Sequence, residues 1–347
     1  MLAVKREGVL LYKTTLGFED EGVLNPAIVQ QGDYVHLFYR AVQTGNHSTI
    51  GYSKLLGPLT VIERQTVPVL VPTLDYESKG IEDPRIVCID RLYYLTYTAY
   101  DGRSARGALA ISKDLKTFEK KGMIVPQMSN NHFKQLMINS NDAMNLRYLR
   151  FAAFENANVG VDTSEEPLWD KNIVLFPRKI NGCFAFFHRI RPDIQLVMVR
   201  KFEKLTPDFW TDYLRHLSDH VVLKPLYNHE ISYIGGGCPP IECKEGWIVI
   251  YHGVRNSPNG FVYSACGALL DLIDPRIEIS RLPYPLFSPE CDYEMEGFVN
   301  NVCFPTGTAL FGDILYIYYG AADEQIACAS VSFTALITEL LLHSNPK

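Results

Sequence analysis

The sequence predicts an all-β fold, a five-bladed β-propeller with an inserted α-helical hairpin on one rim. One pattern recurs five times: a proline starts an apolar run, a short polar turn follows, and an aromatic-rich run comes next. The copies begin at Pro26, Pro84, Pro177, Pro239 and Pro305. Their turns have the Gly/Asn/Asp chemistry that closes β-hairpins. Because such repetition is typical of radially arranged β-units, we expect residues 1–347 to form one domain.

Each copy supplies several strands of a unit. The aromatic-rich runs are residues 34–40, 93–98, 184–189, 247–252 and 314–319. A third run, rich in small residues, follows at 48–53, 107–112, 262–270 and 326–332. These runs give at least three strands per unit, and four strands would fill the repeat.

The interval between Pro84 and Pro177 is longer than the others. Between about residues 127 and 170 the apolar positions recur at helical spacing, which predicts the inserted helical hairpin. Residues 207–215 have a similar pattern and predict another helix. The apolar run 333–342 fits either a last strand or a short helix. Insertions on a repeat scaffold tend to shape the binding face or a subunit contact, so a homo-oligomer is one possibility.

Composition excludes several classes of function. The formal charge of −6 and the absence of a Lys/Arg block argue against nucleic acid as a partner. No apolar stretch approaches the ~18 residues of a membrane span, and the first residues have no signal-peptide pattern. We therefore expect a cytoplasmic protein. The eight cysteines form no CxxC pair, so we expect buried thiols and no metal site.

Equivalent positions of the repeats should converge on the axis of a propeller. One set precedes the prolines: Asn25, Asp83, Phe176, Cys238 and Phe304. The other set ends the aromatic-rich runs: Arg40, Thr98, His188 with Arg189, His252 and Tyr319. A carboxylate, several cations and aromatic rings around one channel predict a site for a sugar and an anion.

Asp83 is the most informative single residue. It lies in Gly80-Ile-Glu-Asp-Pro-Arg85, where the Asp-Pro bond favours an extended backbone at the start of a strand. Strand alternation predicts that Glu82 points to the opposite face and that Arg85 returns to the face of Asp83. The alternative is that Asp83 caps a turn and that Arg85 pairs with it for structural reasons.

Arg40, Arg106, Lys171 and His252 are cationic candidates from different units. Each alone also fits a solvated surface charge. Arg40 and His252, however, end apolar strands that should face inward. Several cations that converge from separate units would make an anion pocket.

These motifs resemble glycoside hydrolase family 130, the family of β-mannoside phosphorylases and some β-mannosidases. The similarity rests on ordered segments: residues 80–86, 176–182, His188-Arg189, 239–241, 246–253, 269–271, 301–305 and 319–323. The family's five-bladed propeller agrees with the number of repeats. The resemblance implies no metal or organic cofactor, with inorganic phosphate as co-substrate.

The resemblance also implies roles for individual residues. Asp83 would be the catalytic acid, which protonates the glycosidic oxygen through the sugar's 3-hydroxyl. Phosphate would attack the opposite face and give α-mannose 1-phosphate with inversion. The expected phosphate-binding residues are Arg40, Arg106, Lys171, His252 and Tyr263, with Arg103 as a competitor for Arg106. The expected sugar-binding residues are Asn25, Arg85, His188, Arg189 and Asp323.

Three functions follow from this interpretation. The first is a phosphorylase that cleaves β-1,2- or β-1,4-linked manno-oligosaccharides. The second is an inverting β-mannosidase, which would need a second carboxylate ~6.5–9.5 Å from the acid; Glu230, Glu294 and Glu296 are candidates. The third is a non-enzymatic interaction module, which would need no carboxylate and cations at its axis.

Overall fold

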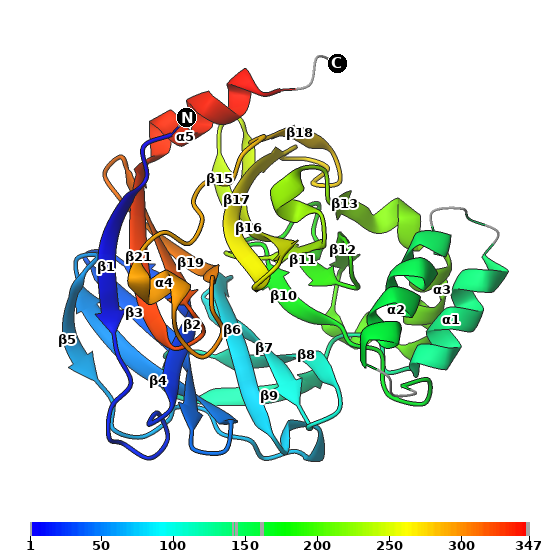
Figure 1. The fold of residues 1–347 in the computed structure, drawn as a ribbon, viewed down its shortest axis with the longest axis horizontal. Coiled ribbons are helices and arrows are strands. Elements are labelled where there is room, and N and C mark those ends of the chain that lie inside the picture. Colours follow the sequence, from blue (N-terminus) through cyan, green and yellow to red (C-terminus); the bar gives the residue numbers. More distant parts are fainter. Residues whose placement is uncertain (1, 141, 143–144, 160–162, 345–347) are drawn as a thin grey trace.

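The computed structural model describes residues 2–140, 142, 145–159 and 163–344. The fold is all-β with few helices (Figure 1). Within these residues the strands form antiparallel meanders, and Figure 1 shows the meanders following one another in sequence order around a common centre. No helix of the described residues is long and apolar enough to cross a membrane.

The first two meanders are joined into one sheet by a single parallel bridge between Ser48 and Gly80. The first consists of β2 (Gly22–Gln31), β3 (Tyr34–Gln43), β4 (His47–Leu56) and β5 (Thr60–Arg64). The second consists of β6 (Gly80–Ile89), β7 (Leu92–Tyr100), β8 (Ala105–Ser112) and β9 (Phe118–Met123).

The remaining meanders form separate sheets. The third consists of β10 (Lys171–Leu175), β11 (Phe184–Arg189), β12 (Ile194–Val199) and β13 (Val221–Leu223). In the fourth, β14 (Tyr233–Gly236) and β15 (Ile241–Cys243) both pair with β16 (Gly246–Ser257), followed by β17 (Gly260–Leu270) and β18 (Glu278–Arg281). The fifth consists of β19 (Cys303–Phe311), β20 (Ile314–Ala321), β21 (Gln325–Ser332) and β1 (Lys5–Leu11).

The two ends of the chain meet in the fifth meander. Strand β1 pairs antiparallel with β21, for example Lys5 with Ser330. In Figure 1 the blue β1 therefore lies beside the orange β21. This pairing joins the N-terminal strand to the last sheet and holds the first and fifth meanders next to each other.

The helices lie outside the sheets (Figure 1). Helices α1 (Asn130–Asn139) and α2 (Asn145–Val159) fall in the predicted insertion, of which residues 141, 143–144 and 160–162 lie outside the described part. Helix α3 (Pro207–Arg215) packs beside α1 and begins with the favourable Thr-Pro start. The other helical elements are α4 (Asp292–Met295), α5 (Phe333–Leu342), η1 (Asp75–Glu77), η2 (Phe202–Lys204), η3 (Leu217–His220) and η4 (Asn228–Glu230).

The apolar run at the C-terminus is a helix. Of the two alternatives left open by its sequence, the structure shows α5, whose N-cap Ser332 accepts a hydrogen bond from the backbone N–H of Ala335 at 3.2 Å. A serine in this position satisfies a backbone donor that the first turn leaves unpaired. Leu336 and Leu340 are the buried residues of this helix.

A buried glutamate stabilises four of the meanders in the same way. Its carboxylate accepts a hydrogen bond from a tyrosine hydroxyl of the second strand and pairs with a basic side chain. The sets are Glu19, Tyr39 and Arg64; Glu77, Tyr97 and Lys120; Glu230, Tyr251 and Arg281; and Glu294, Tyr319 and Arg6. Because an unpaired buried charge is unfavourable, removing one partner of such a pair typically costs about 3–5 kcal/mol.

Candidate active site

A bulge in the first strand of three meanders positions the polar residues at the centre. In each bulge, one residue has a left-handed backbone: Asn25 (φ 51°), Asp83 (φ 47°) and Asn172 (φ 59°). The register shifts between Leu24 and Ala27, between Glu82 and Arg85, and between Lys171 and Val174. Asn and Asp are the residues other than glycine that adopt this conformation most readily.

This register corrects the predicted alignment of the third repeat. Asn172, not Phe176, is the equivalent of Asn25 and Asp83. Phe176 follows β10, and its ring packs in the core against Phe187 and Trp247, with centroids 4.9 and 5.0 Å away. The proline of this repeat therefore lies further along the chain than its counterparts Pro26 and Pro84, which belong to their bulges.

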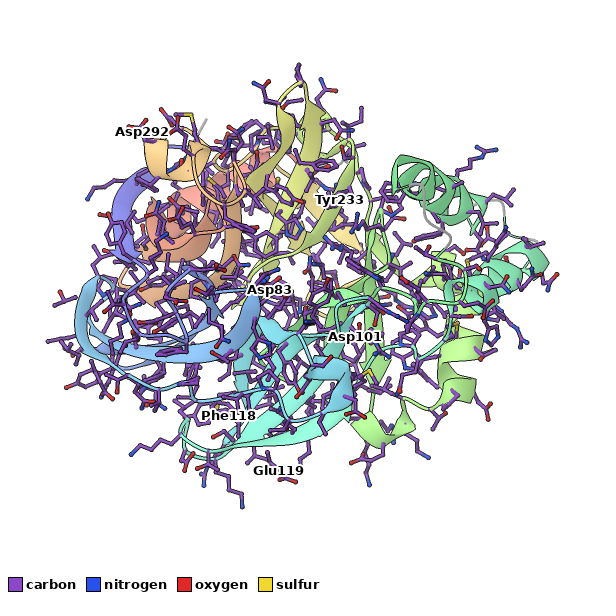
Figure 2. The ribbon with its side chains drawn as sticks, turned by 60° about the horizontal axis from the view of Figure 1, so that its bottom comes forward. Asp83, Asp101, Phe118, Glu119, Tyr233 and Asp292 are labelled. Atoms are coloured by element: carbon purple, nitrogen blue, oxygen red, sulfur yellow. The ribbon has the colours of Figure 1, made fainter. Side chains whose placement is uncertain are left out.

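Asp83 is buried, with 8% of its surface exposed. Its backbone is left-handed and not extended as predicted from the Asp-Pro bond, because the bulge turns the strand at this residue. Asn25 donates a hydrogen bond of 2.6 Å from Nδ2 to Asp83 Oδ1. In Figure 2 Asp83 lies near the middle of the molecule, whereas Glu119 and Asp292 lie toward its periphery.

Arg40 contacts the carboxylates of both Glu82 and Asp83. Its Nη2 donates to Glu82 Oε1 at 2.8 Å, and its Nη1 lies 3.8 Å from Asp83 Oδ1. The prediction that Glu82 points to the opposite face from Asp83 is therefore wrong. The bulge interrupts strand alternation, so adjacent side chains reach the same guanidinium.

The charges around Asp83 keep it ionised in the free protein. Burial alone would raise the pKa of Asp83, but the positive charges of Arg40, Lys171 and Arg85 and the Asn25 hydrogen bond outweigh it and lower that pKa. Arg85 reaches Asp83 through the backbone: its Nη1 donates to the carbonyl oxygens of Asp83 and Pro84, both at 3.0 Å. Arg85 thus holds the bulge in shape as well as supplying charge.

The pKa of Asp323 is shifted in the opposite direction from that of Asp83. Burial raises the pKa of Asp323 to about 6; the charges of Asp83 and Glu82 act in the same direction, and those of Arg40 and Lys171 oppose them. Asp323 therefore shares the electrostatic environment of Asp83. Two carboxylates whose pKa values are pushed apart are typical of catalytic sites.

Lys171 and Arg189 form the cationic side of the site, and His252 lies beside them. Lys171 pairs in register with Arg189 across β10 and β11, and Arg189 Nη1 lies 3.3 Å from His252 Nε2. Burial lowers the pKa of Lys171 below its ordinary value, although the charge of Asp83 acts in the opposite direction. Burial, assisted by the charges of Arg189, Arg85 and Lys171, lowers the pKa of His252 well below its ordinary value. His252 is therefore a neutral hydrogen-bonding group and not the cation that we predicted.

Tyr263 and Arg106 are less directly connected to Asp83. The Tyr263 hydroxyl is 2.5 Å from that of Tyr233, and its ring centroid lies 6.1 Å from that of His252. Arg106 pairs with Asp101 at 3.0 Å, and its backbone bridges to Asp170, the neighbour of Lys171. Arg103, the competitor for Arg106, is exposed.

His188 does not reach the candidate site. It is fully buried, with Nδ1 2.7 Å from Asp170 Oδ2 and Nε2 2.8 Å from the hydroxyl of Tyr213 in α3. Because side chains alternate along β11, Arg189 faces the site and His188 faces α3. Side chains alternate along β20 as well. Tyr319 faces outward and donates a hydrogen bond to Glu294, so the inward position of β20 belongs to Gly320 and not to Tyr319 as predicted.

The candidate bases for a hydrolase serve other purposes. Glu230 accepts from Tyr251 and pairs with Arg281, and Glu294 accepts from Tyr319 and pairs with Arg6. Both are fully buried in these contacts. Glu296 is exposed, beyond the end of α4. The polar contacts of Glu230 and Glu294 are with these tyrosines and arginines and not with Asp83, so the structure gives no support to a water-activating role for them.

One buried group of potential metal ligands exists among the described residues. Ligand atoms of His229, Glu230 and Cys266 lie within 4.8 Å of one another. The Glu230 carboxylate, however, already pairs with Arg281 at 3.2 Å. A guanidinium in this position disfavours a metal cation, so the group is better explained as part of the structural glutamate arrangement.

A cleft of about 960 Å³ opens beside the cationic side of the site. It is lined by Arg147, Arg150 and Phe151 of α2 and by segments 191–192, 225–228 and 231–233, with Asn256 and Phe261 from the β16–β17 hairpin. Tyr233 joins the cleft to the site, because it lines the cleft and its ring lies 5.3 Å from the Arg189 guanidinium. Clefts of this size that combine aromatic and polar groups are typical of ligand sites.

Comparison with known proteins identifies the family. A family model described as beta-1,4-mannooligosaccharide phosphorylase matches residues 18–340. The chain belongs to glycoside hydrolase family 130. A 1,2-β-oligomannan phosphorylase from Thermoanaerobacter sp. (strain X514) is 33% identical over 343 residues, which cover 95% of this chain and 97% of that protein.

Other members of family 130 are similar over part or all of the chain. A β-1,4-mannooligosaccharide phosphorylase from Ruminococcus albus is 40% identical over 172 residues, 48% of this chain and 49% of that protein. The solved structure of a β-1,2-mannobiose phosphorylase from Listeria innocua, in complex with β-1,2-mannobiose, aligns over 99% of this chain and 100% of its own. Its TM-score is 0.71 at 21% identity, a likeness that concerns the fold.

Proposed function

We propose that this family 130 protein is an inverting phosphorylase of β-mannosides. Its five meanders would form a five-bladed propeller, with the site where their first strands meet. The observation that carries the proposal is that Arg40 Nη1 lies 3.8 Å from the buried carboxylate of Asp83, whose pKa is lowered by the charges of Arg40 and Lys171. A proton donor and an anion-binding group within one electrostatic environment are what a phosphorolytic displacement needs.

In the proposed reaction, a phosphate oxygen attacks the anomeric carbon while the glycosidic bond on the opposite face breaks. The leaving oxygen receives a proton that originates from Asp83 and passes through the 3-hydroxyl of the mannosyl unit. Lys171, Arg189 and Arg40 would offset the charge of the dianion, and neutral His252 would add a hydrogen bond. The product is α-mannose 1-phosphate, with inversion at the anomeric carbon.

The charges also suggest how Asp83 acquires its proton. In the free protein, Arg40 and Lys171 hold the pKa of Asp83 below its ordinary value. A bound phosphate dianion would neutralise these cations and so raise the pKa of Asp83. Asp323, whose pKa burial raises to about 6, would hold sugar hydroxyls and keep part of its proton near neutral pH. Proton loading would then accompany phosphate binding.

The cleft beside Tyr233 would hold the acceptor portion of the substrate. Phe261 and Phe151 line the cleft and would offer ring faces on which sugars can stack. The buried ring of Tyr233 packs against both of them and against the Arg189 guanidinium, and so connects them to the site. Curated relatives are phosphorylases of β-1,2- and β-1,4-linked mannosides. Both linkages are therefore the substrates to test first.

We also propose a cytoplasmic location. Each of the eight cysteines is a free thiol, and several are buried as small apolar groups. Thiols in this state fit a reducing compartment.

The decisive experiment is incubation with β-1,2- and β-1,4-mannobiose, with and without inorganic phosphate. We expect cleavage only with phosphate and α-mannose 1-phosphate as the product. Release of free mannose at the same rate without phosphate would instead support a mannosidase, and no turnover of either disaccharide or of longer mannosides would support the interaction module.

A further inference from the structure

Asn172 occupies the third of the three equivalent bulges. Asn25 and Asp83 have the other two, and these two residues are joined by a hydrogen bond. In each bulge the preceding residue pairs in register with the inward residue of the next strand: Leu24 with Arg40, Glu82 with Thr98 and Lys171 with Arg189. Asn172 is therefore the bulge residue of β10, the strand that also brings Lys171 to the site.

The Asn172 amide is buried and unpartnered. Only 3% of the residue is exposed, and neither Oδ1 nor Nδ2 has a hydrogen-bond partner within the described part of the chain. Leaving buried polar groups unpaired is unfavourable, so such exceptions in a folded protein call for an explanation. A ligand that supplies the missing partner is one.

The surroundings of the amide indicate the chemistry of that ligand. A Cβ atom at Gly235 would lie 2.6 Å from Asn172 Nδ2 and 2.5 Å from His252 Nε2, so the amide and the imidazole sit together over this glycine. Arg189 Nη1 is 3.3 Å from the same imidazole nitrogen, and Lys171 precedes Asn172 in the chain. The amide therefore lies within the cationic side of the site.

We propose that Asn172 binds the phosphate co-substrate, with its Nδ2–H groups donating to a phosphate oxygen. The inference rests on the proposed function and adds a residue that orients the anion. Lys171 and Arg189 provide charge but have flexible side chains, whereas Asn172 is fixed by its bulge. A buried neutral donor orients phosphate without adding to the repulsion between the cations.

Two variants test this role without straining the backbone. Asn172→Gly removes the amide at a left-handed position that glycine adopts freely, and Asn172→Asp keeps the shape but replaces the donor with an anion. We expect the KM for phosphate to rise about ten- to a hundredfold in Asn172→Gly and further in Asn172→Asp. The KM for mannobiose should change less than about threefold. Asn181→Gly is the matched control, because Asn181 is an exposed left-handed asparagine (φ 51°) in a hairpin turn.

Phosphate binding is also measured directly on the substrate-free protein, by calorimetry and by the rise in Tm that inorganic phosphate causes. Both should be lost in Asn172→Asp and retained in Asn181→Gly. A raised KM for mannobiose with unchanged phosphate binding would overturn the proposal, as would unchanged values for both. If the parent protein binds phosphate and loses this binding in Asn172→Asp, yet cleaves mannobiose without phosphate, the proposed function fails and the Asn172 site stands.

Discussion

The side-chain amide of Asn25 donates a 2.6 Å hydrogen bond to the Asp83 carboxylate, and both residues have a left-handed backbone. Two bulges from adjacent meanders thus meet at the proposed acid. The contact needs a glycine at position 320, where a Cβ atom would lie 2.0 Å from Asn25 Oδ1. The fifth meander therefore leaves space for a hydrogen bond between the first two.

Replacing Asp83 with asparagine should lower turnover severely and leave the fold intact. The variant keeps the size and backbone preference of the residue but removes the proton donor. We expect kcat to fall by about 10²–10⁴-fold, measured as release of mannose 1-phosphate, with Tm changed by only a few degrees. Asp90→Asn is the control, since Asp90 is an exposed left-handed aspartate in a turn. Near-normal kcat in Asp83→Asn would exclude this residue as the acid.

Lys171→Ala should weaken phosphate binding selectively. Lys171 and Asp83 act on each other's pKa, and the register pairs Lys171 with Arg189. We expect the KM for phosphate to rise at least about tenfold and the KM for mannobiose to change much less. Lys179→Ala removes a lysine that pairs with Asp90 on the surface and serves as the control. Equal changes in both KM values would show that the phosphate site is misplaced.

Asp323→Asn should make the protein more stable at neutral pH while lowering its activity. The pKa of Asp323 is about 6 in the folded state, above its ordinary value of 3.8. Below pH 3.8 both states carry the proton and the effect vanishes. Between pH 3.8 and 6 the unfolded state loses its proton while the native state keeps it, so the native protein is progressively destabilised, and above pH 6 the loss of stability stays constant. Urea unfolding at pH 4 and 7 should show a gain of about 1–3 kcal/mol for the variant at pH 7 only. The same gain at both pH values would contradict the raised pKa.

Glu294→Gln should affect stability and not the reaction type. Glu294 is fully buried, accepts from Tyr319 and pairs with Arg6 at 2.7 Å. We expect a loss of about 3–5 kcal/mol in the free energy of unfolding and an unchanged phosphate requirement. The exposed Glu296→Gln is the control. If Glu294→Gln instead kept its stability and lost phosphate-independent mannose release, the glutamate would be a hydrolytic base.

Phe261→Ala should remove a preference for longer substrates. Phe261 lines the cleft at the tip of the β16–β17 hairpin, and 44% of it is exposed. For the parent protein we expect kcat/KM to rise from mannobiose to mannotetraose, because stacking adds about 1 kcal/mol or more per sugar ring. In the variant this rise should disappear, with mannobiose turnover unchanged. A dependence on length that survives Phe261→Ala would place the acceptor elsewhere; Tyr12→Ala, which alters another exposed ring, is the control.

Much of the site could be predicted because strand ends determine it. Arg40 and His252 end apolar runs, so the repeat pattern predicted inward positions for both; Arg40 contacts Asp83, and His252 lies beside Arg189. The bulges could not be predicted in this way, because one extra residue breaks the alternation on which the placement of Glu82 depended. Asn172 was missed for the same reason. Its signal was an asparagine directly after Lys171 at the start of an apolar strand, comparable with Asn25.

The contacts that turn residues away from the candidate site could not be predicted from the sequence either. His188 and Arg189 are adjacent, and which of them faces the site depends on Tyr213 in α3 and on Asp170. The structural role of Glu230 and Glu294 depends on tyrosines 21 and 25 residues away along the chain. These tyrosines, Tyr251 and Tyr319, recur at the same place in their repeats as Tyr39 and Tyr97. This recurrence was the available signal.

The measurement that tests the account most directly is cleavage of mannobiose in heavy-oxygen water with phosphate present. If an anion held opposite Asp83 is the nucleophile, mannose 1-phosphate should form in the α configuration with no solvent oxygen at its anomeric carbon, one molecule for each mannobiose consumed. Mannose that carries the heavy oxygen at that carbon from the first turnover, without mannose 1-phosphate, would show that water is the nucleophile and would contradict the account.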